Sequence, residues 1–312
     1  ETGNGNYVSG PLGLDNTKKY QARIKTNDNK VYLSDLEPII YTPPIDSVGY
    51  TTAANGIQIY VNTHNPADNT RYYRWEFEEV WKILTPYTSL YVSNGSRISA
   101  RTPQQDVHTC WASDVSTGII VSSSIKLAHD VIYQAPLTPV AANSEKLGAR
   151  YSILVKQYGI TADAFTFWDQ LRKNTETLGS IFDAQPSEIS GNIHCVTNQA
   201  ERVFGFVGVT NVKTKRVYIN KGELPADYRS AINNSCFFFG EDTVINRLKP
   251  PYLNTVKDLV PTSSPYTIVD AKIFLLPPSY RDTAAGYYAV KSACGDCSNR
   301  GSTIKPSFWV DQ

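Results

Sequence analysis

The chain has 312 residues, which corresponds to about two domains of ordinary size. Hydrophobic residues make up 41% of the sequence and charged residues 19%, which is a globular composition rather than a disordered one. The formal net charge of +1 argues against a general electrostatic grip on nucleic acid. The sequence also holds no apolar run long enough to predict a membrane-spanning helix.

Residues 1–45 consist of short alternating runs separated by turn-forming segments, which is typical of β-strands. The chain has no methionine, and its first residues, ETGNGNYVSG, carry no secretion signal. We therefore expect the remainder of a longer or processed precursor, in which residues 1–45 are the C-terminal part of an N-terminal β-sandwich domain whose beginning is missing. The prolines of TPPIDS favour an extended linker, so we predict a boundary near Pro44 and a second domain over residues 46–312.

Residues 47–160 carry the alternating pattern of a second β-sandwich. Three segments place mostly apolar and aromatic residues on one face of a strand: Ile57, Ile59 and Val61; Tyr73, Trp75 and Phe77; and Tyr151, Ile153, Val155 and Gln157. A tryptophan on an early strand and a tyrosine on a late one are features of immunoglobulin-like and fibronectin-like sandwiches. The sequence therefore predicts a mainly β protein of this architecture.

One substantial helix is predicted near residues 161–178, inserted after the sandwich strands. Thr161 is a suitable N-cap, and Gly179 is suited to end the helix. Phe165 and Trp168 lie at helical spacing, and we interpret them as aromatic residues that dock the helix on the sandwich. The alternative is that they form a platform for a ligand.

The region after the helix is predicted to be largely irregular. The segment ERVFGFVGVTNVKTKRVYIN indicates a β-hairpin around TNVKTK. From residue 221 to residue 290 the chain is rich in proline: Pro225, Pro250, Pro251, Pro261, Pro265, Pro277 and Pro278. Long proline-rich connections in a compact protein are often binding loops or segments that pack over a neighbour.

The five cysteines are candidates for disulfide bonds: Cys110, Cys195, Cys236, Cys294 and Cys297. A zinc site is an alternative with His108 and His194 as further ligands, but only one pair, Cys294 and Cys297, is close in sequence. A redox pair should open a helix after a strand, whereas here a turn-forming segment follows. We favour disulfides that staple the C-terminus in an oxidising compartment. The pairing is left open, and the odd count leaves one thiol free or paired outside the chain.

The sequence contains no motif that identifies a catalytic, cofactor-binding or metal-binding residue. Glu76, Glu78 and Glu79 form a cluster of carboxylates, and paired carboxylates serve glycoside hydrolysis when they are held at a suitable separation. Glu76 and Glu78 would share one face of a strand, and we favour a simpler interpretation, in which this is a solvated face opposite Trp75 and Phe77.

The order of several motifs resembles a family of Bacteroidota outer-membrane lipoproteins labelled domain of unknown function 4249. The motifs are RYYRWEFEEVWKI, HTCWAS, the stretch from Tyr151 to Cys195, and the closing CGDC with Lys305 to Trp309. The resemblance runs over essentially the whole chain. It implies an N-terminal lipid anchor outside this chain, a location on the extracellular face of the outer membrane, and a gene beside that of a TonB-dependent receptor. The family supplies no catalytic residues to carry over.

We therefore expect a non-enzymatic cell-surface lipoprotein without a cofactor, which acts as an accessory or binding subunit. Its partner would be a TonB-dependent, SusC-like β-barrel, in a role like that of SusD-type lipoproteins, or another large outer-membrane complex. Phe165, Trp168 and Trp309 are the candidate docking aromatics. The alternative is a surface hydrolase that acts on glycan or peptide.

Overall fold

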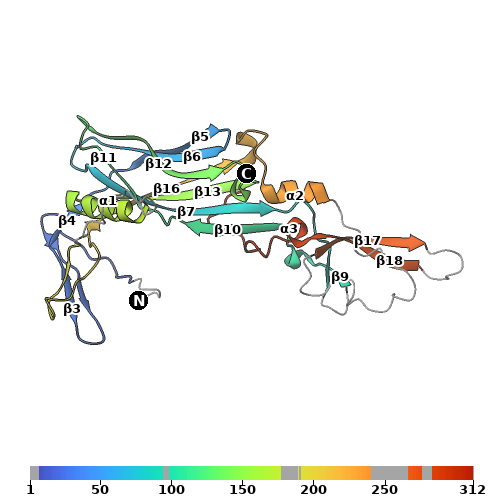
Figure 1. Ribbon diagram of the computed structural model, residues 1–312, viewed down its shortest axis with the longest axis horizontal. Helices are drawn as coiled ribbons and strands as arrows, with labels where there is room; N and C mark the ends of the chain where they lie inside the picture. Colours follow the sequence, from blue (N-terminus) through green and yellow to red (C-terminus); the bar gives the residue numbers. More distant parts are fainter. Residues whose placement is uncertain are drawn as a thin grey trace, which may run out of the picture.

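The computed structural model describes residues 7–93, 98–176, 189, 191–239, 266–275 and 283–311. These residues form a mainly β protein with one substantial helix, which confirms the predicted fold class. Figure 1 shows an elongated molecule, in which a β-sandwich lies between a group of short N-terminal strands and a C-terminal hairpin. No helix of the described residues is long and apolar enough to cross a membrane.

Two antiparallel sheets form the sandwich. The first has the strand order β12-β6-β5, and the second has the order β10-β7-β13-β16, with β11 also paired to β7. Their bounds are β5 (Ile45–Ala53), β6 (Gly56–Asn65), β7 (Tyr72–Leu84), β10 (Thr109–Val115), β11 (Ile120–Ser123), β12 (Asp130–Ala141), β13 (Arg150–Gly159) and β16 (Val212–Asn220).

The main hydrophobic core lies between these two sheets. Ile59 and Val61 of β6 pack in one cluster with Tyr73 and Trp75 of β7 and Ile153 of β13, and all five are at most 1% exposed. Burying an aliphatic or aromatic side chain of this kind stabilises the folded state by about 1.5–3 kcal/mol. The three faces predicted from alternation are confirmed, because every residue assigned to them is buried.

A buried glutamine joins the two sheets inside this core. The Gln157 side-chain oxygen accepts a hydrogen bond from Trp75 Nε1 at 2.9 Å. Its nitrogen donates to the Pro43 carbonyl at 2.9 Å and to Thr63 Oγ1 at 3.0 Å. Gln157 is fully buried, and these partners offset the cost of removing its amide from water.

The N-terminal strands form two small sheets with strands from later in the chain. The sheet orders are β1-β4-β15 and β14-β3-β2. Their bounds are β1 (Lys19–Tyr20), β2 (Arg23–Lys25), β3 (Val31–Ser34), β4 (Glu37–Ile40), β14 (Ile193–Cys195) and β15 (Val209–Thr210). The predicted boundary near Pro44 falls between β4 and β5, and the division into two domains stays a prediction.

The helix α1 (Ala162–Glu176) starts where the sequence predicts. Thr161 Oγ1 accepts a hydrogen bond from the Ala164 backbone N–H at 3.2 Å, so Thr161 is the N-cap. Gly179, the predicted end of the helix, lies outside the described residues.

The predicted hairpin around TNVKTK is wrong. β15 pairs in parallel with β4, while β16 pairs antiparallel with β13. Only Asn211 separates β15 from β16, which is too short a connection for a chain reversal, so the chain continues from one sheet into another. The Asn211 side chain fixes this crossing by accepting a hydrogen bond from the Thr42 N–H at 2.7 Å.

The region from 221 to 290 contains more regular structure than predicted. It holds η3 (Lys221–Glu223), α2 (Ala231–Phe239), β17 (Tyr266–Leu275) and β18 (Thr283–Lys291). Pro225 accepts a turn hydrogen bond from Tyr228. The other six prolines lie outside the described residues. The remaining elements are β8 (Tyr91–Ser93), β9 (Ile98–Ala100), η1 (Pro103–Gln105), η2 (Glu145–Leu147) and α3 (Ser292–Gly295).

Candidate functional site

Four of the five cysteines form two disulfide bonds. Cys110 of β10 bonds to Cys297, and Cys236 of α2 bonds to Cys294. Cys195 of β14 is a buried free thiol. The two neighbouring cysteines of CGDC therefore bond to separate partners, and they tie the C-terminal segment to both β10 and α2. Sulfur atoms in a disulfide are not thiolate ligands, so this segment is a staple and not a zinc site.

Backbone hydrogen bonds reinforce the two cross-links. The Cys297 N–H donates to the Val107 carbonyl at 2.9 Å, and the Tyr87 N–H donates to the Cys294 carbonyl at 3.0 Å. We call Tyr87, Val107 and the four bonded cysteines the disulfide junction. Each disulfide lies in its own small cluster of buried side chains, with Ile83 at one and Val290 at the other.

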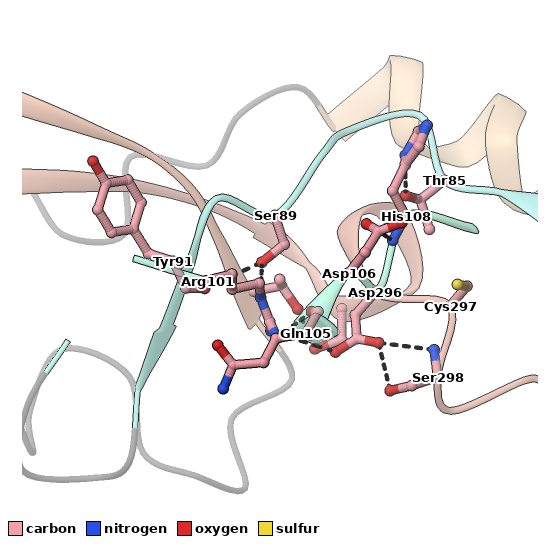
Figure 2. Close-up of polar contacts among 12 residues, drawn as sticks. Thr85, Ser89, Tyr91, Arg101, Gln105, Asp106, His108, Asp296, Cys297 and Ser298 are labelled. Atoms are coloured by element: carbon pink, nitrogen blue, oxygen red, sulfur yellow. Dashed lines mark hydrogen bonds and ion pairs between the residues drawn. The ribbon is translucent and has the colours of Figure 1, made fainter. Parts of the chain in front are cut away.

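Polar contacts hold the loop that carries the two C-terminal cysteines (Figure 2). One Asp296 carboxylate oxygen accepts hydrogen bonds from the Ser298 N–H at 2.8 Å and its hydroxyl at 2.6 Å. The other lies 3.9 Å from the Arg101 guanidinium, which also donates to Ser89 Oγ at 3.0 Å. Burial lowers the pKa of Arg101, and the Asp296 carboxylate opposes that shift. These contacts fix the cysteines against the segment between β7 and β10.

His108, a possible zinc ligand in the sequence, has a different role. Its ring Nδ1 lies 2.9 Å from Thr85 Oγ1 (Figure 2). Thr85 Oγ1 in turn donates to the Tyr87 carbonyl at 2.8 Å. The described residues contain no group of three or more His, Cys, Asp or Glu side chains that could hold a metal ion. The histidine therefore belongs to the hydrogen bonds around the disulfide junction.

A two-stranded hairpin extends from this junction. We call β17 and β18 the arm, and Figure 1 shows it projecting from the sandwich along the long axis of the molecule. The strands pair antiparallel from Tyr266 opposite Lys291 to Leu275 opposite Thr283. At the base of the arm, Val290 is 1% exposed and Thr267 is 7% exposed. The Thr267 hydroxyl donates a hydrogen bond to Ser292 Oγ at 3.2 Å.

The predicted docking aromatics all pack within the chain. Phe165 lies 5.2 Å from the ring of Tyr72, and Trp168 covers the Arg74 guanidinium at 4.2 Å. Trp309 is 4% exposed and packs edge-on against two further rings, those of Trp111 and Tyr218. Sequence reasoning missed Phe167, whose ring packs on Phe204 and Phe206. The sequence signal was helical spacing, because Ala164 and Phe167 are one turn apart and therefore share a face of the helix. The structure shows that both are buried.

The three clustered carboxylates do not share one face. Glu76 and Glu78 lie on the outer face of β7. There Glu76 pairs with Arg74 at 2.6 Å, and Glu78 pairs with Lys156. Glu79 instead lies on the inner face and is 3% exposed. The inward alternation of β7 through residues 73, 75 and 77 continues to 79.

The buried Glu79 carboxylate lies on the wall of a cavity of about 590 Å³ between β12 and the connection from β10 to β11. It accepts hydrogen bonds from the Tyr151 hydroxyl at 2.5 Å and from Lys146 Nζ at 2.5 Å. Lys146 also lies 3.5 Å from Asp114. Burial, and then the charge of Glu79, raises the pKa of Tyr151 far above its usual range, so its hydroxyl keeps its proton.

These contacts hold the Glu79 carboxylate in hydrogen bonds rather than leaving it free for proton transfer. Both oxygens of Glu79 have a donor, and one ammonium group serves two carboxylates. The cavity is large enough for a small polar molecule, and Gln58 and Arg172 also line it.

Comparison with known proteins identifies the family. No curated protein and no solved structure matches the chain. The family model of a domain of unknown function (DUF4249) matches residues 1–216, which end within β16, before α2 and the arm. The expectation that the resemblance continues to residue 312 stays a prediction. Because the match covers more than half of the sequence, this chain belongs to the DUF4249 family.

Proposed function

We propose that the chain is a non-enzymatic accessory or binding subunit on the extracellular face of the outer membrane. Its partner is a TonB-dependent, SusC-like β-barrel or another large outer-membrane complex, and a lipid anchor outside this chain holds it at the membrane. Membership of the family supports the setting, because the motifs quoted above resemble lipoproteins encoded beside such receptors. The arm is the observation that carries the proposed interaction.

The arm has the form of an element that needs a partner. β17 has 10 residues, so it extends about 33 Å from end to end. Among the described strands β17 and β18 pair only with each other. A two-stranded hairpin alone is marginally stable in water, and unpaired strand edges are sites for the addition of further strands. A β-rich partner that packs on the arm, or adds a strand to it, supplies the missing contacts.

The disulfide junction prepares the arm for binding. Cys294 follows β18 by three residues, and its bond to Cys236 fixes the end of the hairpin to α2. The bond from Cys297 to Cys110 fixes the same segment to the sandwich. Because the base is already ordered, a partner does not have to order it on binding, and this lowers the entropic cost of association.

The test is a purification from native membranes in mild detergent, followed by mass spectrometry of the proteins that accompany the chain. We expect a β-barrel to accompany the unmodified chain. In the arm variant, residues 268–289 are replaced by a short glycine–serine linker, so that Thr267, Val290 and both disulfides are kept. We expect this variant to lose the barrel.

The matched control is Leu36→Asp, which changes an exposed side chain among the N-terminal strands and should leave the barrel bound. Isolation of the unmodified chain without any outer-membrane protein would contradict the proposed function. A barrel that stays bound to the arm variant would contradict the role of the arm while leaving the accessory function in place.

A surface hydrolase is the second candidate, and one observation favours it. Glu79 and Asp114 both line the cavity beside Lys146. The contacts of Glu79 favour a structural role over proton transfer. The purified chain, screened for release of sugar reducing ends or peptide termini, tests this candidate, and an activity abolished by Asp114→Asn would support it over the accessory function.

A further inference from the structure

An exposed apolar tip lies at the end of the sandwich away from the arm. The connection from β11 to β12 and the first residues of β12 form it, and Figure 1 shows these two strands reaching the end of the molecule opposite β17 and β18. We call the side chains of Ile125, Leu127, Val131 and Tyr133 the apolar tip; they are 53%, 53%, 43% and 76% exposed. Four large apolar side chains are therefore presented to solvent within nine residues of chain.

The local conformation does not explain these residues. The Leu127 N–H donates to the Ser124 carbonyl at 2.8 Å, so Ile125 and Lys126 occupy the corner of a tight turn. Such corners usually carry Gly, Asn, Asp, Ser or Pro, whose backbone preferences or side-chain hydrogen bonds suit a turn. Isoleucine offers neither advantage at a solvent-exposed corner, so its presence points to something outside the turn.

The tip is held rigidly by polar contacts beneath it. The Arg71 guanidinium donates to the carbonyls of Ser124, Leu127 and Ala128, each at 3.4 Å. Asp130 is 1% exposed, and its carboxylate accepts hydrogen bonds from the Ser124 hydroxyl at 2.5 Å and the Tyr73 hydroxyl at 2.6 Å. The apolar side chains are thus presented in a fixed arrangement, so little conformational entropy is lost when they are buried.

The apolar tip also carries a cation. Lys126 is exposed between Ile125 and Leu127, and it forms no ion pair with any residue that the structure describes. The nearby Asp130 is buried, and Asp68 pairs with His129 at 3.2 Å. The tip therefore combines aliphatic side chains with a free ammonium group on a flexible stem.

We propose that the apolar tip inserts into the surface of a phospholipid bilayer. Ile125 and Leu127 enter the boundary between head groups and acyl chains, while Lys126 extends back to bind phosphate. Tyr133 is suited to the head-group level, because its ring is apolar and its hydroxyl is polar. A projecting turn with a cation between two aliphatic residues fits a bilayer better than a closed protein pocket, where the ammonium group would have to be desolvated. The proposal depends neither on the lipid anchor nor on the barrel.

Sedimentation with vesicles tests the proposal on the chain of 312 residues. The probes are vesicles of phosphatidylcholine alone and of phosphatidylcholine with a minor fraction of phosphatidylglycerol. We expect the chain to sediment with both and more with the anionic vesicles. Ile125→Asp combined with Leu127→Asp should lower the partition coefficient at least about tenfold, since each substitution removes an apolar side chain from the interface. Lys126→Gln should remove the preference for anionic vesicles.

Ile304→Asp is the matched control, because Ile304 is 78% exposed in the C-terminal segment, and it should leave sedimentation unchanged. The emission of a polarity-sensitive fluorophore attached at Ile125→Cys should shift to shorter wavelength when vesicles are added. The emission of the same dye at Ile304→Cys should not shift. The buried Cys195 thiol does not compete for the dye in the folded chain. Failure of the unmodified chain to bind either vesicle, or equal binding by the double variant, would overturn the proposal. The proposal would also be overturned if the double variant lost a protein partner in the purification from native membranes but still bound vesicles.

Discussion

The sandwich and the C-terminal arm are held in place by different forces. In the sandwich, buried side chains from two facing sheets form one continuous cluster that includes Trp75, Tyr151 and Ile153. At the base of the arm the buried clusters are small, and each is built around a disulfide. One region depends on the volume of its apolar core, and the other depends on covalent bonds.

The difference follows from geometry. A two-layer sandwich encloses a core, so each added strand buries one face. A two-stranded hairpin whose strands pair with no other described strand encloses no such core by itself. Cross-links stabilise such a region by restricting its unfolded chain instead. Cross-links can thus order a projecting element without a larger core.

The largest expected effect comes from breaking the sandwich core. Trp75→Ala removes a side chain that is 1% exposed and leaves the Gln157 oxygen without its indole donor. We expect the free energy of unfolding to fall by about 3–5 kcal/mol, from the cavity and the lost hydrogen bond together. Urea denaturation followed by far-ultraviolet circular dichroism measures this loss.

The matched control is Trp168→Ala on α1, where the indole is half-buried and covers Arg74. This substitution should lower the free energy of unfolding by about 1 kcal/mol, which is the size of a partly exposed cation–π contact. Equal losses for the two tryptophans would show that the interface between the sheets is not the main source of stability.

The next largest effect comes from breaking the disulfide junction. Cys110→Ala combined with Cys297→Ala removes a bond between residues 187 positions apart in sequence. We expect the free energy of unfolding of the C-terminal segment to fall by about 2–4 kcal/mol, because the restriction on the unfolded chain is removed. Limited proteolysis with mass spectrometry should then show faster cleavage in the C-terminal segment, while a fragment that contains the sandwich strands survives.

Cys195→Ser is the control for this experiment, because that cysteine is buried but not bonded. Its digestion pattern should match that of the unmodified chain. Cleavage of the sandwich as fast as the arm would mean that the two regions unfold as one unit, and the comparison drawn above would fail.

Local patterns predicted the sandwich well. Alternation over residues 57–61, 73–77 and 151–157 identified three strands and their buried faces, because a strand turns successive side chains to opposite sides. The start of α1 followed from Thr161, whose hydroxyl accepts a backbone N–H that has no partner within the helix. Each of these features is decided within a few residues of chain.

Features decided at long range were not predictable. The pairing of Cys110 with Cys297 depends on the fold that brings β10 beside the C-terminus, and no spacing rule contains that information. The burial of Glu79 was not predicted, because a glutamate is seldom buried and its partners Lys146 and Tyr151 lie more than 60 residues away in sequence. The sequence indicated a disulfide staple at the C-terminus, but not the pairing of its cysteines or the arm that it supports.

The smallest expected effect sharpens the comparison through a third region, the N-terminal strands, which are held largely by polar contacts. Glu201 accepts hydrogen bonds from Lys30 Nζ at 2.8 Å and from the Tyr32 hydroxyl at 2.7 Å. These contacts lower the pKa of Glu201 from 4.5. A depressed pKa means that the stabilisation is complete above pH 4.5 and is lost as the pH falls through the folded-state pKa.

We therefore expect amide protection in β3 to fall in mild acid, while the sandwich and the arm keep theirs. The fall should be a few-fold at most, which is the size expected for an exposed ion pair. Hydrogen exchange with mass spectrometry, corrected for intrinsic rates, measures this, and Glu201→Gln should make protection in β3 low and independent of pH. Acid loss of protection in the arm before β3 would place the pH-sensitive contacts at the disulfide junction instead.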